Sequence, residues 1–137
     1  MKASVQWESA VRFKATSGTG HELILDGAPE SGGNNAGMRP MEAVLIGMGG
    51  CSAYDVVTIL EKGRAGLVRC EVELTAERAE DIPKVFTRVH MHYVVSGATL
   101  KPAQVARAVE LSARKYCSAT AMIEKTAEVT FDFEIAA

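Results

Sequence analysis

The sequence predicts an α+β protein with antiparallel sheet. Stretches of alternating polar and apolar residues, typical of strands, occur at the start, in the middle and at the end of the chain. One long apolar segment with helix start and stop signals separates the first strands from the middle ones. Because strands and helices do not alternate regularly, a doubly wound parallel sheet is not expected.

The first 25 residues are predicted to form three short strands. Polar and apolar residues alternate over residues 3–8 and 11–14, and a turn at 17–20 precedes a third strand over 22–25. A polar loop, residues 28–38, follows these strands. Its composition predicts mobility.

A long helix is predicted from Pro40 to Lys62. Proline suits the first helical position, Glu42 lies in the first turn, and Lys62 is followed by a glycine. At ~1.5 Å per residue the helix would be about 34 Å long. It is apolar on nearly every side, so burial on most faces is expected. A chain this small offers little cover, which predicts a homodimer whose second subunit covers one side.

The remaining elements are two strands, two helices and a final strand. Alternation predicts strands over residues 68–75 and 88–95, and a helix begins near Pro102. The helical pattern stutters around Cys117, and Ser118 is predicted to cap a short helix that runs through Lys125. A last strand is predicted over residues 129–135. All elements are assigned to one domain, residues 1–137.

Length, composition and charge exclude several classes of protein. The 137 residues suffice for one domain, and 47% hydrophobic and 23% charged residues are typical of globular proteins. A net charge of -2 without a basic block argues against a nucleic-acid or anionic-membrane partner. The N-terminus lacks an apolar signal segment, and the uncharged stretch 43–54 is shorter than the ~18 residues that cross a bilayer. A cytoplasmic location is therefore expected.

Three cysteines are too few for a disulfide scaffold, and cytoplasmic cysteines are normally reduced. Cys51 lies in the long apolar helix and Cys117 at the stutter, whereas Cys70 alternates with apolar strand residues and is expected in the core. Free cysteines usually pack as small apolar side chains. Taken alone, the pattern therefore leaves both packing and reversible thiol chemistry open for Cys51 and Cys117.

Other polar residues have ordinary interpretations. His90 and His92 share one strand face, where a two-histidine metal site is conceivable, but the solvated face of an antiparallel sheet explains them more simply. No metal is expected. Asp55 lies one helical turn after Cys51 and is expected to be mainly structural, bonded within the chain or across the dimer.

The cysteine motifs resemble those of a known family. Residues 39–45 read Arg-Pro-Met-Glu-Ala-Val-Leu, residues 49–52 Gly-Gly-Cys-Ser, and residues 115–118 Lys-Tyr-Cys-Ser. This set resembles the OsmC/Ohr family of thiol-dependent peroxide reductases, and most closely its YhfA-like branch. The resemblance implies the OsmC-like fold, an intertwined homodimer in which antiparallel sheets wrap around long central helices and the sites lie at the subunit interface.

The resemblance also implies an activity. Family members reduce hydroperoxides, often organic ones, in oxidative-stress defence, with an external thiol or dithiol as reductant and no bound cofactor. By this resemblance Cys51 attacks the peroxide, and Cys117 resolves the oxidised Cys51 by forming a disulfide. Apolar neighbours that include Met48 and Met122 are expected to contact the substrate. On helix-dipole reasoning alone, Cys117 would be the better thiolate because it precedes a helix start.

Activation of Cys51 requires a cation. In the peroxidase members an arginine has this role, held by a glutamate directly after the proline of the long helix. Here Met41 occupies that position and the acid is Glu42, one residue later. Arg12 and Arg39 are the two candidate arginines.

This departure from the family pattern also supports an alternative function. The alternative is a ligand-binding member that uses the interface cavity without efficient peroxide turnover. The two hypotheses differ in whether an arginine guanidinium lies near Cys51 and a carboxylate.

Overall fold

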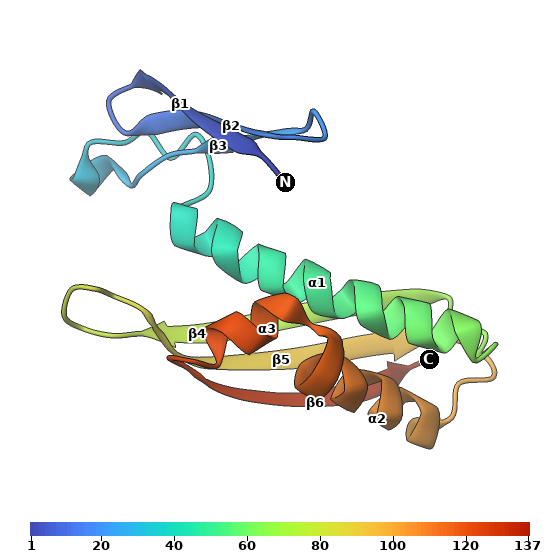
Figure 1. The fold of residues 1–137 in the computed structure, drawn as a ribbon. Coiled ribbons are helices and arrows are strands. Elements are labelled where there is room, and N and C mark those ends of the chain that lie inside the picture. The colour runs from blue at the N-terminus through green and yellow to red at the C-terminus, as the bar shows by residue number, and fades with distance from the viewer. The chain divides into compact units, whose positions relative to one another are not determined.

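The computed structural model describes the whole chain, residues 1–137, and divides it into two compact units. The first is Met1–Leu45 and the second is Ile46–Ala137. The long helix α1 (Pro40–Lys62) begins in the first unit and continues in the second (Figure 1). The single OsmC-like domain over residues 1–137 stays a prediction.

The first unit contains the three predicted strands, β1 (Ala3–Ser9), β2 (Arg12–Ser17) and β3 (Glu22–Leu25). They form an antiparallel sheet in the order β1-β2-β3. β1 is exposed along its whole length.

The loop after β3 is anchored, which its composition does not reveal. The buried carboxylate of Asp26 accepts hydrogen bonds from the backbone N–H groups of Gly27, Asn34 and Ala36 at 2.7, 3.1 and 3.0 Å. The bond from Ala36, followed by the one from Gly27, holds the pKa of Asp26 below its usual value. A 3₁₀ turn, η1 (Pro29–Ser31), lies within this anchored loop.

Helix α1 has the predicted bounds, Pro40–Lys62. At its start the Glu42 carboxylate accepts the backbone N–H of Arg39 at 2.8 Å, which satisfies a group that the helix itself cannot pair. The buried residues form one stripe: Met48, Gly49, Ser52, Val56 and Leu60. The expected burial on most faces is not reached in the single chain, because Val44, Ile46 and Tyr54 are exposed, Tyr54 at 75%.

By length and composition alone, α1 would also suffice to cross a membrane, with a mean hydropathy of 1.6 over its most apolar window. Its buried stripe packs within the second unit, as in a core helix. The packing is close at Gly49, where an added Cβ atom would lie 2.6 Å from a methyl group of Leu74.

The second unit contains β4 (Arg69–Arg78), β5 (Phe86–Ser96) and β6 (Glu128–Ala136) in the order β4-β5-β6. β4 and β5 are antiparallel, but β5 and β6 are parallel, so the prediction of purely antiparallel sheet is wrong here. The segment between β5 and β6 contains helices and is long enough to return the chain to the same end of the sheet. The order β5, helices, β6 is thus the strand–helix–strand pattern that permits parallel pairing.

Three helices lie over one face of this sheet, α1, α2 (Pro102–Leu111) and α3 (Ser118–Ile123) (Figure 1). The core of the second unit contains Met48, Val56 and Leu60 from α1, with further residues from β5 and α2: Val89, Met91, Tyr93, Val95, Val105 and Val109. Cys70 pairs with Val95 across the sheet and is partly buried, and burial raises the pKa of its thiol.

The predicted stutter is a change of helix type. Helix α2 passes into a π-helical turn, η2 (Ser112–Tyr116), and the backbone becomes extended at Cys117 before α3 begins. Cys117, not Ser118, caps α3, because its sulfur accepts the backbone N–H of Thr120 at 3.4 Å. Helix α3 ends at Ile123, two residues before the predicted end at Lys125.

The two strand histidines are on the outer face of the sheet, as predicted. His90 Nε2 and His92 Nδ1 lie 3.0 and 2.6 Å from the same oxygen of Asp132. The hydrogen bond to Asp132 raises the pKa of His92, and the one from His92 lowers the pKa of Asp132.

We expect His92 to titrate above its ordinary pKa of 6.5. Since the folded-state pKa is raised, protonated His92 stabilises the fold below pH 6.5, and this stabilisation is lost as the pH rises through the folded pKa. NMR titration of the imidazole signals measures the pKa of His92 directly. Asp132→Asn should lower the pKa of His92, whereas Asp81→Asn, a control in the β4–β5 turn, should not. An unchanged His92 titration in Asp132→Asn would contradict the assignment.

Candidate functional site

The structure places two cysteines from distant segments next to each other. Cys51 lies on α1, and Cys117 lies between η2 and α3. Cys51 lies close enough to Cys117 to raise the pKa of the Cys117 thiol, and both are free thiols. They differ in accessibility, because Cys117 is only 3% exposed whereas Cys51 is partly exposed.

The surroundings of Cys117 favour a protonated thiol. Burial raises its pKa most, its hydrogen bonds with Thr120 lower it, and the neighbouring Cys51 raises it further. The Cys117 S–H group points to the Met48 carbonyl oxygen, with the sulfur 3.9 Å away. The dipole argument for a thiolate at Cys117 is opposed by desolvation, which outweighs the hydrogen bonds from the short helix α3 and raises the pKa of Cys117.

This arrangement suits a two-step thiol reaction. A partly exposed cysteine can meet a small electrophile from solvent, whereas a buried thiol next to it can react only with that first cysteine. A disulfide between the two needs no large movement of distant segments, because the two side chains are already neighbours. Each cysteine is placed by a helix element, α1 for Cys51 and the η2–α3 junction for Cys117.

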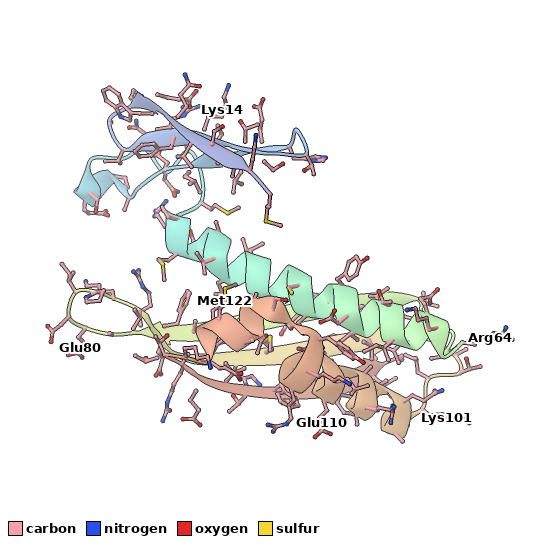
Figure 2. The ribbon with its side chains drawn as sticks, viewed as in Figure 1. Lys14, Arg64, Glu80, Lys101, Glu110 and Met122 are labelled. Carbon is pink, nitrogen blue, oxygen red and sulfur yellow. The ribbon has the colours of Figure 1, made fainter.

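The two methionines expected at a substrate pocket have different environments. The Met48 side chain is fully buried in the core, although its carbonyl oxygen faces Cys117. Met122 lies on α3 and is 69% exposed (Figure 2). Beside α1 the structure has a hollow of about 380 Å³ with these lining residues: Tyr54, Asp55, Thr58, Ile59, Lys62, Leu111 and Tyr116.

The charged candidates belong to the first unit. The Arg39 guanidinium donates to the side-chain oxygen of Asn35 at 3.0 Å and to the Gly37 carbonyl at 3.2 Å. Arg12 pairs with the Glu8 carboxylate at 3.1 Å. Glu42 accepts the backbone N–H of Arg39, so its hydrogen bond in this chain is to the backbone and not to a guanidinium.

Sequence reasoning missed a chain of polar side chains next to the cysteine pair. The hydroxyl of Ser52 bonds to the hydroxyls of Tyr93 and Ser112, the latter at 2.8 Å. Ser112 in turn donates to the Asp55 carboxylate at 3.0 Å. The signal was present, since Tyr93 and Ser112 occupy inward positions of apolar patterns, and buried polar groups there need partners.

The α+β fold and the neighbouring cysteines, one on a long helix and one at a helix junction, are the features of a thiol-dependent protein class. The family model described as "OsmC-like protein" matches residues 32–132. The chain belongs to the OsmC-like protein family. Among curated relatives, Protein YhfA of Escherichia coli (strain K12) is 48% identical over 137 residues, which cover 100% of this chain and 99% of that protein.

Solved structures agree with this assignment. A hypothetical protein from Aquifex aeolicus VF5 is 28% identical with a TM-score of 0.86, over 98% of this chain and 95% of that one. An organic hydroperoxide resistance protein OsmC from Legionella pneumophila is 15% identical with a TM-score of 0.73, over 97% of this chain and 95% of that one, and shows the shared fold. The resemblance to the OsmC/Ohr family and its YhfA-like branch is confirmed, as is the OsmC-like fold.

Proposed function

We propose that the protein is a cytoplasmic, cysteine-based hydroperoxide reductase that acts on organic hydroperoxides in oxidative-stress defence. The observation that carries this proposal is the proximity of the partly exposed Cys51 to the buried Cys117. Membership of the OsmC-like family supports it, as does the fold shared with a protein named for organic hydroperoxide resistance.

The reaction would begin at Cys51. Its thiolate attacks the terminal peroxide oxygen, so that an S–O bond forms and the O–O bond breaks. The sulfur loses two electrons and becomes a sulfenic acid, and the alkoxide takes a proton and leaves as the alcohol. Cys117 then attacks the Cys51 sulfur, which forms the disulfide and releases water.

An external dithiol would complete the cycle. Thiol–disulfide exchange returns Cys51 and Cys117 to the reduced state and converts the dithiol to its disulfide. The two electrons that reduce the peroxide thus come from the external thiol, and the proposal requires no bound cofactor.

A homodimer belongs to the same proposal. Large apolar side chains are uncovered on β1 and along α1, among them Trp7, Ile46 and Tyr54. A second copy of the chain would remove this surface from water. Arg12 and Arg39 are the candidates for the cation that stabilises the Cys51 thiolate, and Glu42 is the candidate carboxylate at that centre.

The test is consumption of cumene hydroperoxide with dithiothreitol as reductant. The protein should accelerate consumption well above the rate of dithiothreitol alone. Cys70→Ser should retain this activity, because Cys70 is not in the neighbouring pair. A rate no higher than that of dithiothreitol alone would disprove the proposal.

A second candidate function is binding of an apolar small molecule without peroxide turnover. It is favoured by the hydrogen bond that Glu42 makes to the Arg39 backbone in place of an arginine side chain. A protein whose thermal midpoint rises with cumyl alcohol while hydroperoxide is not consumed would support this alternative.

A further inference from the structure

The hydrogen-bonded series Tyr93–Ser52–Ser112–Asp55 beside the cysteines connects three elements of the second unit. Tyr93 comes from β5, Ser52 and Asp55 from α1, and Ser112 from the first position of η2. Tyr93, Ser52 and Ser112 are all fully buried, whereas Asp55 is partly exposed and lines the hollow of about 380 Å³. These polar groups therefore depend on one another for their hydrogen bonds.

The Asp55 carboxylate is the polar end of this hydrogen-bonded series. A carboxylate accepts but cannot donate, so Ser112 donates to Asp55 at 3.0 Å, with the Ser52 carbonyl as a second, longer acceptor at 3.3 Å. Ser52 then shares one hydrogen bond with Ser112 and one with Tyr93, and the Tyr93 hydroxyl also donates to the Met91 sulfur at 3.6 Å. A chain of this kind, which ends on an anion, is stronger than its separate neutral bonds.

The chain is directly connected to both cysteines. Ser52 follows Cys51 on α1, and Asp55 lies one helical turn after Cys51. On the other side, the Cys117 backbone N–H donates to the Ser112 carbonyl at 2.9 Å, which closes the π-helical turn. Ser112 thus bonds to α1 through its side chain and to Cys117 through its backbone.

We propose that Ser112, held by Asp55 and Ser52, is a positioning residue that keeps the Cys117 thiol against Cys51 and so favours the disulfide between them. The inference rests on the proposed function in its resolving step. It adds that Ser112 and Asp55 determine the effective concentration of the Cys117 thiol near Cys51, and therefore how readily the disulfide forms.

The test is the equilibrium of the cysteine pair with glutathione. The protein dithiol and oxidised glutathione exchange to give the protein disulfide and two molecules of reduced glutathione, and two electrons pass to glutathione. Ser112→Ala should lower the equilibrium constant for the protein disulfide about tenfold, which makes the reduction potential about 30 mV less negative. No peroxide is present, so a failed peroxidase assay would leave this result standing.

Two further variants keep the test decisive if Ser112→Ala does not fold. Asp55→Ala removes the acceptor at a partly exposed position and should shift the equilibrium in the same direction. Asp55→Asn keeps an oxygen that accepts from Ser112 and should remain within about twofold of the wild-type constant.

The matched control is Thr99→Val. It removes the hydrogen bond from the Thr99 hydroxyl to the Ala65 carbonyl at 2.9 Å, also within the second unit. Loss of this bond should lower the thermal midpoint without changing the thiol equilibrium. The inference is overturned if folded Asp55→Ala or Ser112→Ala keeps the wild-type constant, if Thr99→Val shifts it equally, or if the wild type forms no Cys51–Cys117 disulfide.

Discussion

Replacing Cys51 with serine is expected to reduce hydroperoxide consumption to the rate of dithiothreitol alone. A serine hydroxyl is not ionised near neutral pH, whereas the reaction needs a thiolate as nucleophile. Cys117 cannot substitute for it, because Cys117 is buried and burial raises the pKa of its thiol. The measurement is the initial rate with cumene hydroperoxide at saturating dithiothreitol.

Cys117→Ser separates the two steps when prereduced protein reacts with cumene hydroperoxide after dithiothreitol has been removed. This variant should consume about one equivalent of peroxide at a rate close to wild type, since Cys51 is intact. It should then accumulate sulfinic acid at Cys51 under excess peroxide, because no neighbouring thiol traps the sulfenic acid. Peptide mass spectrometry detects the added oxygen atoms. If Cys51→Ser stays active while Cys117→Ser is inactive from the first turnover, the assigned roles are reversed.

Replacing Ile46 with lysine is expected to dissociate the proposed homodimer. Ile46 is 55% exposed on α1 although it belongs to an apolar helix. Burying an isoleucine side chain is worth ~1.5–3 kcal/mol, and a symmetric dimer loses this twice, so the dissociation constant should rise at least about a hundredfold. Sedimentation equilibrium of wild type and variant measures the change.

Val68→Lys is the control for this experiment. Val68 is 82% exposed and immediately precedes β4, so a lysine there tests for a general effect of added charge. It should leave the dimer intact. Circular dichroism shows whether an Ile46→Lys monomer keeps its fold. A folded Ile46→Lys protein that remains dimeric would exclude this face of α1 from the interface.

Local patterns were sufficient for most secondary structure. The bounds of α1 were predicted correctly because proline and glycine punctuate that helix, and the alternation in β5 placed His90 and His92 on the outer face. The parallel pairing of β5 with β6 was missed, because pairing depends on how the intervening helices return the chain, and residue alternation carries no strand direction.

The candidate site was likewise predictable only in part from the sequence. The motifs identified both cysteines and the family, which the comparison with known proteins confirms. The chemical difference between the cysteines was not predictable, since it depends on burial and on hydrogen bonds between distant segments. Helix-dipole reasoning favoured Cys117 as the thiolate, whereas desolvation in the folded chain raises its pKa.

By itself the sequence determined the fold class, the long apolar helix, the family and the two cysteines that carry the proposed chemistry. Only the tertiary structure decided which thiol is buried, that the two thiols are neighbours, and that Ser52, Tyr93, Ser112 and Asp55 form one hydrogen-bonded chain beside them. The physical reason is that helix and strand periods depend on neighbours along the chain. Desolvation and hydrogen bonding depend on which distant residues meet in space.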